Sequence, residues 1–152
     1  MNYEIVKLKE KTVAGIIIKT SNCDPNMQKV ISETWQKFFM EGFYQSILNK
    51  KNHNTIGLYT NYENKLNGKY DMMACCEIFN EDSLSNEIEI IRIPEGKYAK
   101  FQIKGNAMEV VGEFWNNIWK MDLNRKFSFD FEEYKGGYEM ENAEIDIYIS
   151  ID

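Results

Sequence analysis

Carboxylates and tyrosines alternate with apolar residues through the last quarter of the chain. Residues 127–134 and 144–151 each read as a strand in which phenylalanines or isoleucines recur at alternate positions. Paired as antiparallel neighbours through a turn at 135–137, the two strands would share one apolar face and one polar face. The polar face would carry Ser128, Asp130, Glu132, Tyr134, Glu144, Asp146, Tyr148 and Ser150.

Two interpretations of this polar face are open. A half-buried antiparallel sheet commonly turns such a face toward water. Alternatively, carboxylates set among aromatic side chains form a pocket for a flat organic cation, because a carboxylate is costly to bury without a partner and aromatic faces attract cations. The second interpretation predicts a ligand site with an acid at its floor.

Composition narrows the classes of partner. The chain has 152 residues and a net charge of −6. Binding to a nucleic-acid backbone requires clustered basic residues, so no direct nucleic-acid partner is expected. No apolar run approaches the roughly 18 residues of a membrane span. The first residues also lack a signal-peptide pattern, so we expect a soluble, cytoplasmic protein with no membrane partner.

The cysteines do not predict a metal site. Cys75 and Cys76 are adjacent, and together with Cys23 they give neither a disulfide framework nor the spacing of zinc ligands. We expect three reduced thiols, no bound metal and no cofactor.

Strands and two amphipathic helices account for most of the chain. The first helix is expected after Asp24 as its N-cap, with Pro25 at the first helical position, and the second after Asn106. The strands are expected at residues 3–8, 12–20, 55–63, 69–79, 87–93, 97–104, 127–134 and 144–151.

The apolar stripes of the two helices match. Trp35 in the first helix stands where Trp115 stands in the second, and Phe39 matches Trp119. We interpret this correspondence as an internal duplication of a strand-strand-helix-strand-strand unit. When the copies are aligned, Thr60 stands where Glu132 stands, so the acid is the asymmetric feature of the pair.

The duplication predicts the fold class. A single α+β domain is expected over residues 1–152, built of pseudo-repeats 1–79 and 87–152. It should contain a mostly antiparallel sheet of about eight strands with two main helices on one face.

An ordered set of segments resembles the GyrI-like, or AraC-type effector-binding, family. The set comprises residues 93–101, the tryptophan-bearing second helix, the Phe-Glu-Glu-Tyr run at 131–134 and the closing strand at 144–149. Residues 35–38 and 56–59 follow the same order, so the resemblance covers essentially the whole chain. It implies a duplicated fold with a pocket between the halves that binds hydrophobic, often cationic, small molecules.

The resemblance also implies the site residues. The family's pocket acid falls on Glu132, and alternation favours Glu132 over Glu133 because Glu132 shares a face with Tyr134. Either tryptophan of the second helix could face the ligand. The implied ligand-binding residues are Glu132, Tyr134, Trp115, Trp119, Tyr59, Asp146 and Tyr148.

Three functions remain open at this point. The favoured one is a stand-alone effector-binding or multidrug-sensing module linked to transcription regulation or toxin protection, since no stretch supplies a helix-turn-helix domain. The second is a GyrI-like hydrolase of small molecules with Glu132 as its base, although no nucleophile–base pair or metal set stands out. The third is a gyrase-modulator-like protein that binds a protein partner through its surface. The oligomeric state stays open.

Overall fold

One curved sheet and three helices make up the fold. The structure, a computed structural model, describes residues 1–65, 67–81, 84–136 and 140–152, and within these ranges eight strands form a single antiparallel sheet. The strands are β1 (Glu4–Leu8), β2 (Lys11–Ser21), β3 (Thr55–Thr60), β4 (Lys69–Glu77), β5 (Glu89–Ile93), β6 (Gly96–Gly105), β7 (Phe129–Tyr134) and β8 (Ala143–Ser150). The helices are α1 (Met27–Met40), α2 (Phe43–Ser46) and α3 (Ala107–Ile118). The predicted α+β class is confirmed.

The strand order is symmetric about the middle of the sheet. The order is β1-β6-β8-β7-β3-β4-β2-β5, so β7 and β3 meet at the centre and equivalent strands follow outward on each side. The outermost strands are exchanged, because β5 pairs with β2 and β1 pairs with β6. This order agrees with a duplicated unit, while the repeat limits of 1–79 and 87–152 stay a prediction.

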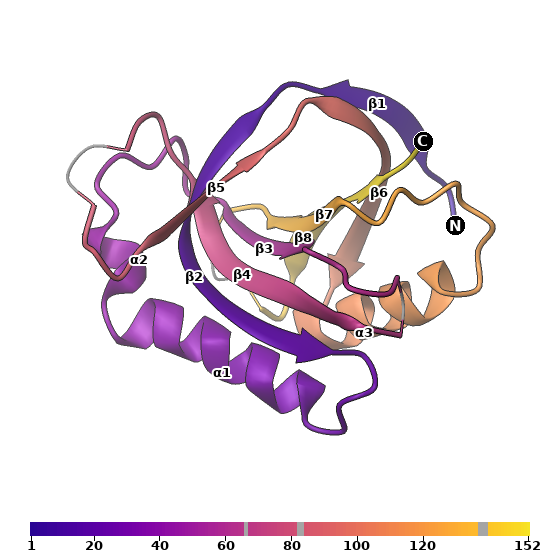
Figure 1. The fold of residues 1–152 in the computed structure, drawn as a ribbon, viewed down its shortest axis with the longest axis horizontal. Coiled ribbons are helices and arrows are strands. Elements are labelled where there is room, and N and C mark those ends of the chain that lie inside the picture. Colours follow the sequence, from indigo (N-terminus) through magenta and orange to yellow (C-terminus); the bar gives the residue numbers. More distant parts are fainter. Residues whose placement is uncertain (66, 82–83, 137–139) are drawn as a thin grey trace.

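Both long helices cover the same face of the sheet. Ala74, which packs beneath α1, lies opposite Gly57 across the β3–β4 pair, and Gly57 lies opposite Glu132 across the β3–β7 pair. Glu132 in turn lies opposite Ile147 of β8, which packs beneath α3. Figure 1 shows the two helices on the outside of the curved sheet, with α1 beneath β2 and β4.

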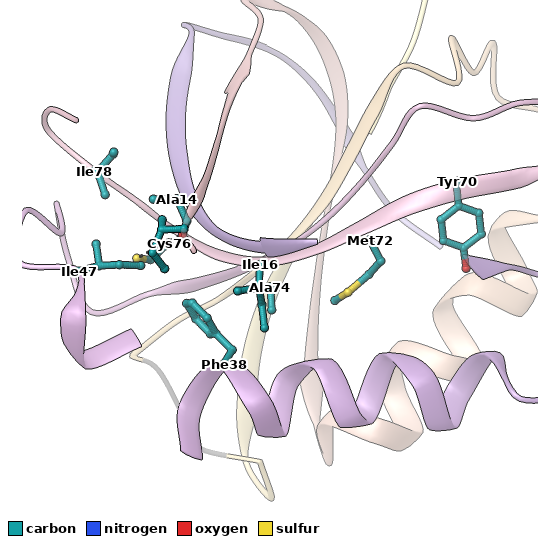
Figure 2. Close-up of a cluster of buried hydrophobic side chains, with 10 residues drawn as sticks. Ala14, Ile16, Phe38, Ile47, Tyr70, Met72, Ala74, Cys76 and Ile78 are labelled. Atoms are coloured by element: carbon teal, nitrogen blue, oxygen red, sulfur yellow. Dashed lines mark hydrogen bonds between the residues drawn. The ribbon is translucent and has the colours of Figure 1, made fainter. Parts of the chain in front are cut away.

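A phenylalanine fixes each helix to the sheet. The side chain of Phe38 points from α1 toward Ile16 and Ala74 and is fully buried (Figure 2). On α3 the buried ring is that of Phe114, whose centroid lies 5.1 Å from that of Phe101. Burial of such large aromatic side chains is the main favourable contribution to this packing.

The opposite face of the sheet is also buried. A second apolar cluster covers it, made of Val13, Ile56, Leu58, Met73, Cys75, Ile93, Tyr98, Phe131 and Tyr148. Because the central strands are buried on both faces, the adjacent Cys75 and Cys76 are both buried. All three cysteines are free thiols.

The first helix begins later than its sequence suggests. Asp24 and Pro25 precede α1, which starts at Met27 with Asn26 as its N-cap. The Asp24 carboxylate accepts a hydrogen bond from the Asn26 backbone N–H at 2.8 Å, so Asp24 caps a turn rather than the helix. Within the described ranges, no helix is long and apolar enough to cross a membrane.

Several strands are shorter than expected, and for β3 and β7 the backbone conformation explains the difference. Asn61, after β3, has a φ of 54°, and Phe127, before β7, has a φ of 55°, values that extended strands do not adopt. Of the turn expected at 135–137, Gly137 lies outside the described residues.

Removing either anchoring ring should cost much of the stability. We expect Phe38→Ala and Phe114→Ala each to lower the free energy of unfolding by about 3–5 kcal/mol, as for other buried phenylalanines. Urea denaturation would measure the loss. Met40→Ala is the matched control, because Met40 is 83% exposed, and it should change stability by no more than about 0.5 kcal/mol. Equal effects at positions 38 and 40 would contradict this description of the core.

Candidate functional site

A buried carboxylate lies at the centre of the sheet, between the two long helices. Glu132 of β7 is only 1% exposed. Its Oε2 accepts hydrogen bonds from the Trp115 Nε1–H at 2.7 Å and from the Tyr59 hydroxyl at 3.1 Å. Its Oε1 accepts a third from the Tyr134 hydroxyl at 2.8 Å. Three neutral donors from β3, α3 and β7 therefore hold the carboxylate.

Aromatic side chains from both halves surround this acid. Trp35 of α1 makes an edge contact with Tyr134, with ring centroids 5.5 Å apart. On the other side, Tyr59 lies edge-on to Trp115 at 5.4 Å and to Tyr70 at 5.8 Å. Each long helix thus contributes one tryptophan to the walls of the site.

Gly57 provides the room for the carboxylate. It lies directly opposite Glu132 across the β3–β7 pair. A Cβ atom at position 57 would sit 2.9 Å from Glu132 Oε1 and 3.2 Å from Cζ2 of Trp35. The alignment of Thr60 with Glu132 is wrong: Thr60 lies on the opposite face of β3, and its hydroxyl donates to the Ser128 carbonyl.

Burial and hydrogen bonding act in opposite directions on this acid. Burial raises the pKa of Glu132 above its ordinary value, and the hydrogen bonds from Trp115, Tyr134 and Tyr59 reduce that rise. Burial, together with the charge of Glu132, raises the pKa of Tyr59 and of Tyr134 well above 10. Both phenols therefore stay protonated and remain donors at neutral pH.

The other buried acids of the described chain all have cationic partners. Glu77 pairs with Lys11 and Lys51, and Glu133 pairs with Lys135. The remaining ion pairs of buried acids are Asp146 with Lys135 and Lys100, and Asp130 with Arg125. Among the residues that the structure describes, Glu132 is the one buried carboxylate with no lysine, arginine or histidine in ion-pair contact.

Asp130, two residues before Glu132, shows the contrast most clearly. It is fully buried on the same face of β7 and accepts hydrogen bonds from Arg125 at 2.8 Å and from the Tyr62 hydroxyl at 2.6 Å. The backbone N–H and the hydroxyl of Ser150 donate to its other oxygen at 2.8 and 3.1 Å. Asp130 is thus neutralised within the chain and fixes the end of β8.

Comparison with known proteins identifies the family. Residues 4–151 match the family described as integron-associated effector binding protein. The chain belongs to this effector-binding family. The resemblance to GyrI-like proteins seen in the sequence is thereby confirmed.

Relatives match over nearly their whole length. The Bacillus subtilis (strain 168) protein YobU, named as a candidate transcriptional regulator, is 30% identical over 154 residues, covering 97% of this chain and 96% of YobU. The Vibrio cholerae integron cassette protein VCH_CASS2 is 27% identical, with a TM-score of 0.81 over 99% of this chain and 95% of that one. SAV2435, solved with bound tetraphenylphosphonium, has the same fold, with a TM-score of 0.82, 21% identity and coverage of 100% and 94%.

In this effector-binding protein, the expectation that β7 and β8 share a single polar face is wrong. In the β7–β8 register Glu132 lies opposite Ile147, whereas Asp146 lies opposite Glu133. Asp146 and Tyr148 therefore lie on the sheet face away from Glu132. A role for either of them in ligand binding stays untested.

The two tryptophans expected in the second helix are distinguished by their positions. Trp115 faces the carboxylate, whereas Trp119 follows the last helical residue and is 39% exposed.

Sequence reasoning did not assign Trp35, Tyr70 or Gly57 to the site. For Gly57 a signal was available in the sequence, since a glycine inside a strand often marks a close approach of another group. Within the described ranges no group of three or more His, Cys, Asp or Glu side chains could hold a metal ion.

A methyl group at position 57 should disturb the carboxylate and Trp35 together. We expect Gly57→Ala to lower the free energy of unfolding by about 1–3 kcal/mol through overpacking. Gly112→Ala is the control, because nothing lies within 4 Å of its added Cβ on α3, and it should stabilise the protein by about 0.5–1 kcal/mol. Chemical denaturation of both variants would test this, and a stabilising Gly57→Ala would contradict the close approach.

The raised pKa of Glu132 predicts how stability depends on pH. The folded protein holds this proton more tightly than the unfolded chain, whose value is 4.5. The contribution of Glu132 is therefore greatest below that value and is lost as pH rises through the folded pKa. Glu132→Gln does not titrate, so its stability relative to wild type should increase with pH across this window.

Removing the hydrogen bond from Tyr134 should shift the pH range over which Glu132 affects stability. The Tyr134 hydrogen bond lowers the pKa of Glu132. In Tyr134→Phe the loss of stability with rising pH should therefore extend to higher pH than in the wild type. Thermal melting of the three proteins across a pH series would show it. Parallel curves for wild type and Glu132→Gln would exclude a perturbed acid at this position.

Proposed function

We propose that this protein binds hydrophobic organic cations between its two halves, with Glu132 as their counter-ion. One observation carries the proposal. Glu132 is hydrogen-bonded only to neutral donors, whereas the other buried acids of the described residues pair with cations of the same chain. A cationic ligand would supply the missing partner.

The energetics favour a cation over a neutral or anionic ligand. A carboxylate removed from water without a cation keeps part of its desolvation cost even when hydrogen-bonded. Aromatic faces add roughly 0.5–2 kcal/mol for a cation placed over them. Trp35, Trp115 and Tyr59 place aromatic rings next to Glu132. An anion would meet the same carboxylate without compensation.

Ligand entry requires these aromatic side chains to move. Glu132 is 1% exposed, so a ligand reaches it only when Trp115 or Trp35 is displaced. These two side chains belong to α3 and α1, which pack on opposite halves of the sheet. Binding would therefore change the packing of a helix against its half, and this change could be read by a regulatory partner.

The relatives support a sensing role. SAV2435, which has the same fold, binds tetraphenylphosphonium, a hydrophobic cation, and YobU carries the name of a regulator. The three free thiols agree with a reducing, cytoplasmic setting. We therefore propose a multidrug-sensing module linked to transcription regulation.

Neutralising Glu132 should weaken cation binding selectively. For 10-methylacridinium, Glu132→Gln should cost roughly 2–5 kcal/mol of binding free energy, the range for truncating one partner of a buried charge pair. Acridine, which is neutral at pH 8, should bind the two proteins alike. Isothermal titration calorimetry would give the affinities, and thermal shifts would follow by mass action.

Glu133→Gln is the matched control for this experiment. Glu133 is the adjacent buried acid, but it faces away from Glu132 and is paired with Lys135. Its substitution should leave 10-methylacridinium affinity unchanged. Equal cation affinity in wild type and Glu132→Gln, or a loss confined to Glu133→Gln, would overturn the proposal.

A further inference from the structure

Arg125 is a buried cation whose hydrogen-bonding capacity is only partly used. Its side chain is 6% exposed, and its Nη2 donates to Asp130 at 2.8 Å. Its Nε and Nη1 groups are buried and have no hydrogen-bond partner among the described residues. Buried donors in folded proteins are nearly always paired, so these groups require an explanation.

Trp115 connects this cation to the proposed ligand site. The guanidinium carbon of Arg125 lies 5.9 Å from the centroid of the Trp115 ring and 4.2 Å from that of Phe127. The same indole donates its N–H to Glu132. One aromatic ring therefore lies against both the acid and the guanidinium, and a ligand ring that replaced the indole would meet both groups.

We infer that Arg125 is a second recognition residue, which donates hydrogen bonds from Nε and Nη1 to an acceptor on the bound ligand. This inference rests on the proposed function and specifies its ligand class: aromatic cations that also carry a carbonyl, ester or ether oxygen. The cation lies against Glu132, and the oxygen lies against Arg125.

Asp130 makes a guanidinium compatible with a cationic ligand. The Arg125–Asp130 pair is neutral overall, so Arg125 offers donors without adding an unbalanced positive charge to the site. Arginine suits this arrangement because its planar fork can hold an acid on one edge and leave N–H groups on another. An ion pair with a purely structural role would not need two further buried donors.

The test compares two cations of nearly equal shape. (4-Acetylphenyl)triphenylphosphonium carries a carbonyl oxygen where (4-isopropylphenyl)triphenylphosphonium carries a methyl group, and the 3-substituted isomers extend the comparison to a second position. Wild-type protein should bind at least one acetyl isomer about tenfold more tightly than its isopropyl counterpart, as expected for a hydrogen bond from a charged donor. Calorimetric titration gives each Kd.

Two variants assign the preference to Arg125. Arg125→Met combined with Asp130→Asn removes the donors without leaving a buried charge unpaired, and Arg125→Lys keeps the pair while removing the fork. Both should lose the acetyl preference while binding tetraphenylphosphonium, which has no acceptor, within about threefold of wild type. Retained tetraphenylphosphonium binding also shows that the variant is folded.

The outcomes separate the two hypotheses. No preference for either acetyl isomer in wild type, or a preference that persists in a folded variant, overturns the role of Arg125 while leaving the role of Glu132 intact. Tetraphenylphosphonium binding that is unaffected by Glu132→Gln overturns the proposed function itself.

Discussion

A carboxylate buried without a cation is the constraint on which this structure depends. Glu132 needs a donor at each side of its head group, and it obtains three from the ring systems of Tyr59, Trp115 and Tyr134. These donors come from three different elements, so the acid is satisfied only when β3, β7 and α3 are all in place. The apolar packing of α3 on the sheet therefore also determines whether Trp115 can donate its hydrogen bond to Glu132.

Symmetry brings the two halves of the chain together at this acid. The strands β3 and β7 are equivalent in the duplicated order and are neighbours at the centre of the sheet. The two strands nevertheless make different contributions at their meeting point, because Gly57 provides space where Glu132 provides charge. A larger side chain at position 57 would fill the region that the carboxylate and Trp35 share. One charged side chain can thus contact groups from both halves.

Local patterns predicted the fold class, the helices and the pairing of Glu132 with Tyr134, because alternation within one strand depends only on neighbouring residues. The prediction that the polar residues of β7 and β8 share one face was wrong, because the register between the two strands decides which residues share a face. A shift of one residue moves every side chain to the other face, and this placed Asp146 away from Glu132. Similarly, Trp115 and Trp119 are four residues apart in the predicted second helix, so helical periodicity could not distinguish them. The contact of Trp35 with the site depends on packing between distant segments, which the sequence pattern does not specify.

Two acids on one face of β7 differ in how the chain balances their charge. Asp130 and Glu132 lie on the same face, and both are buried. Asp130 is held by Arg125 and by the backbone of β8, so its charge is used within the fold. Glu132 is held only by groups that can be exchanged without breaking an ion pair, namely two phenols and an indole. Displacing them would cost hydrogen bonds between neutral donors and one acid, a loss that the cation of the proposed function would offset, whereas displacing Arg125 would leave a buried charge unpaired. The same strand therefore contains one acid whose charge is balanced within the sheet and one that is held by neutral donors alone, which is the arrangement the proposed cation site requires.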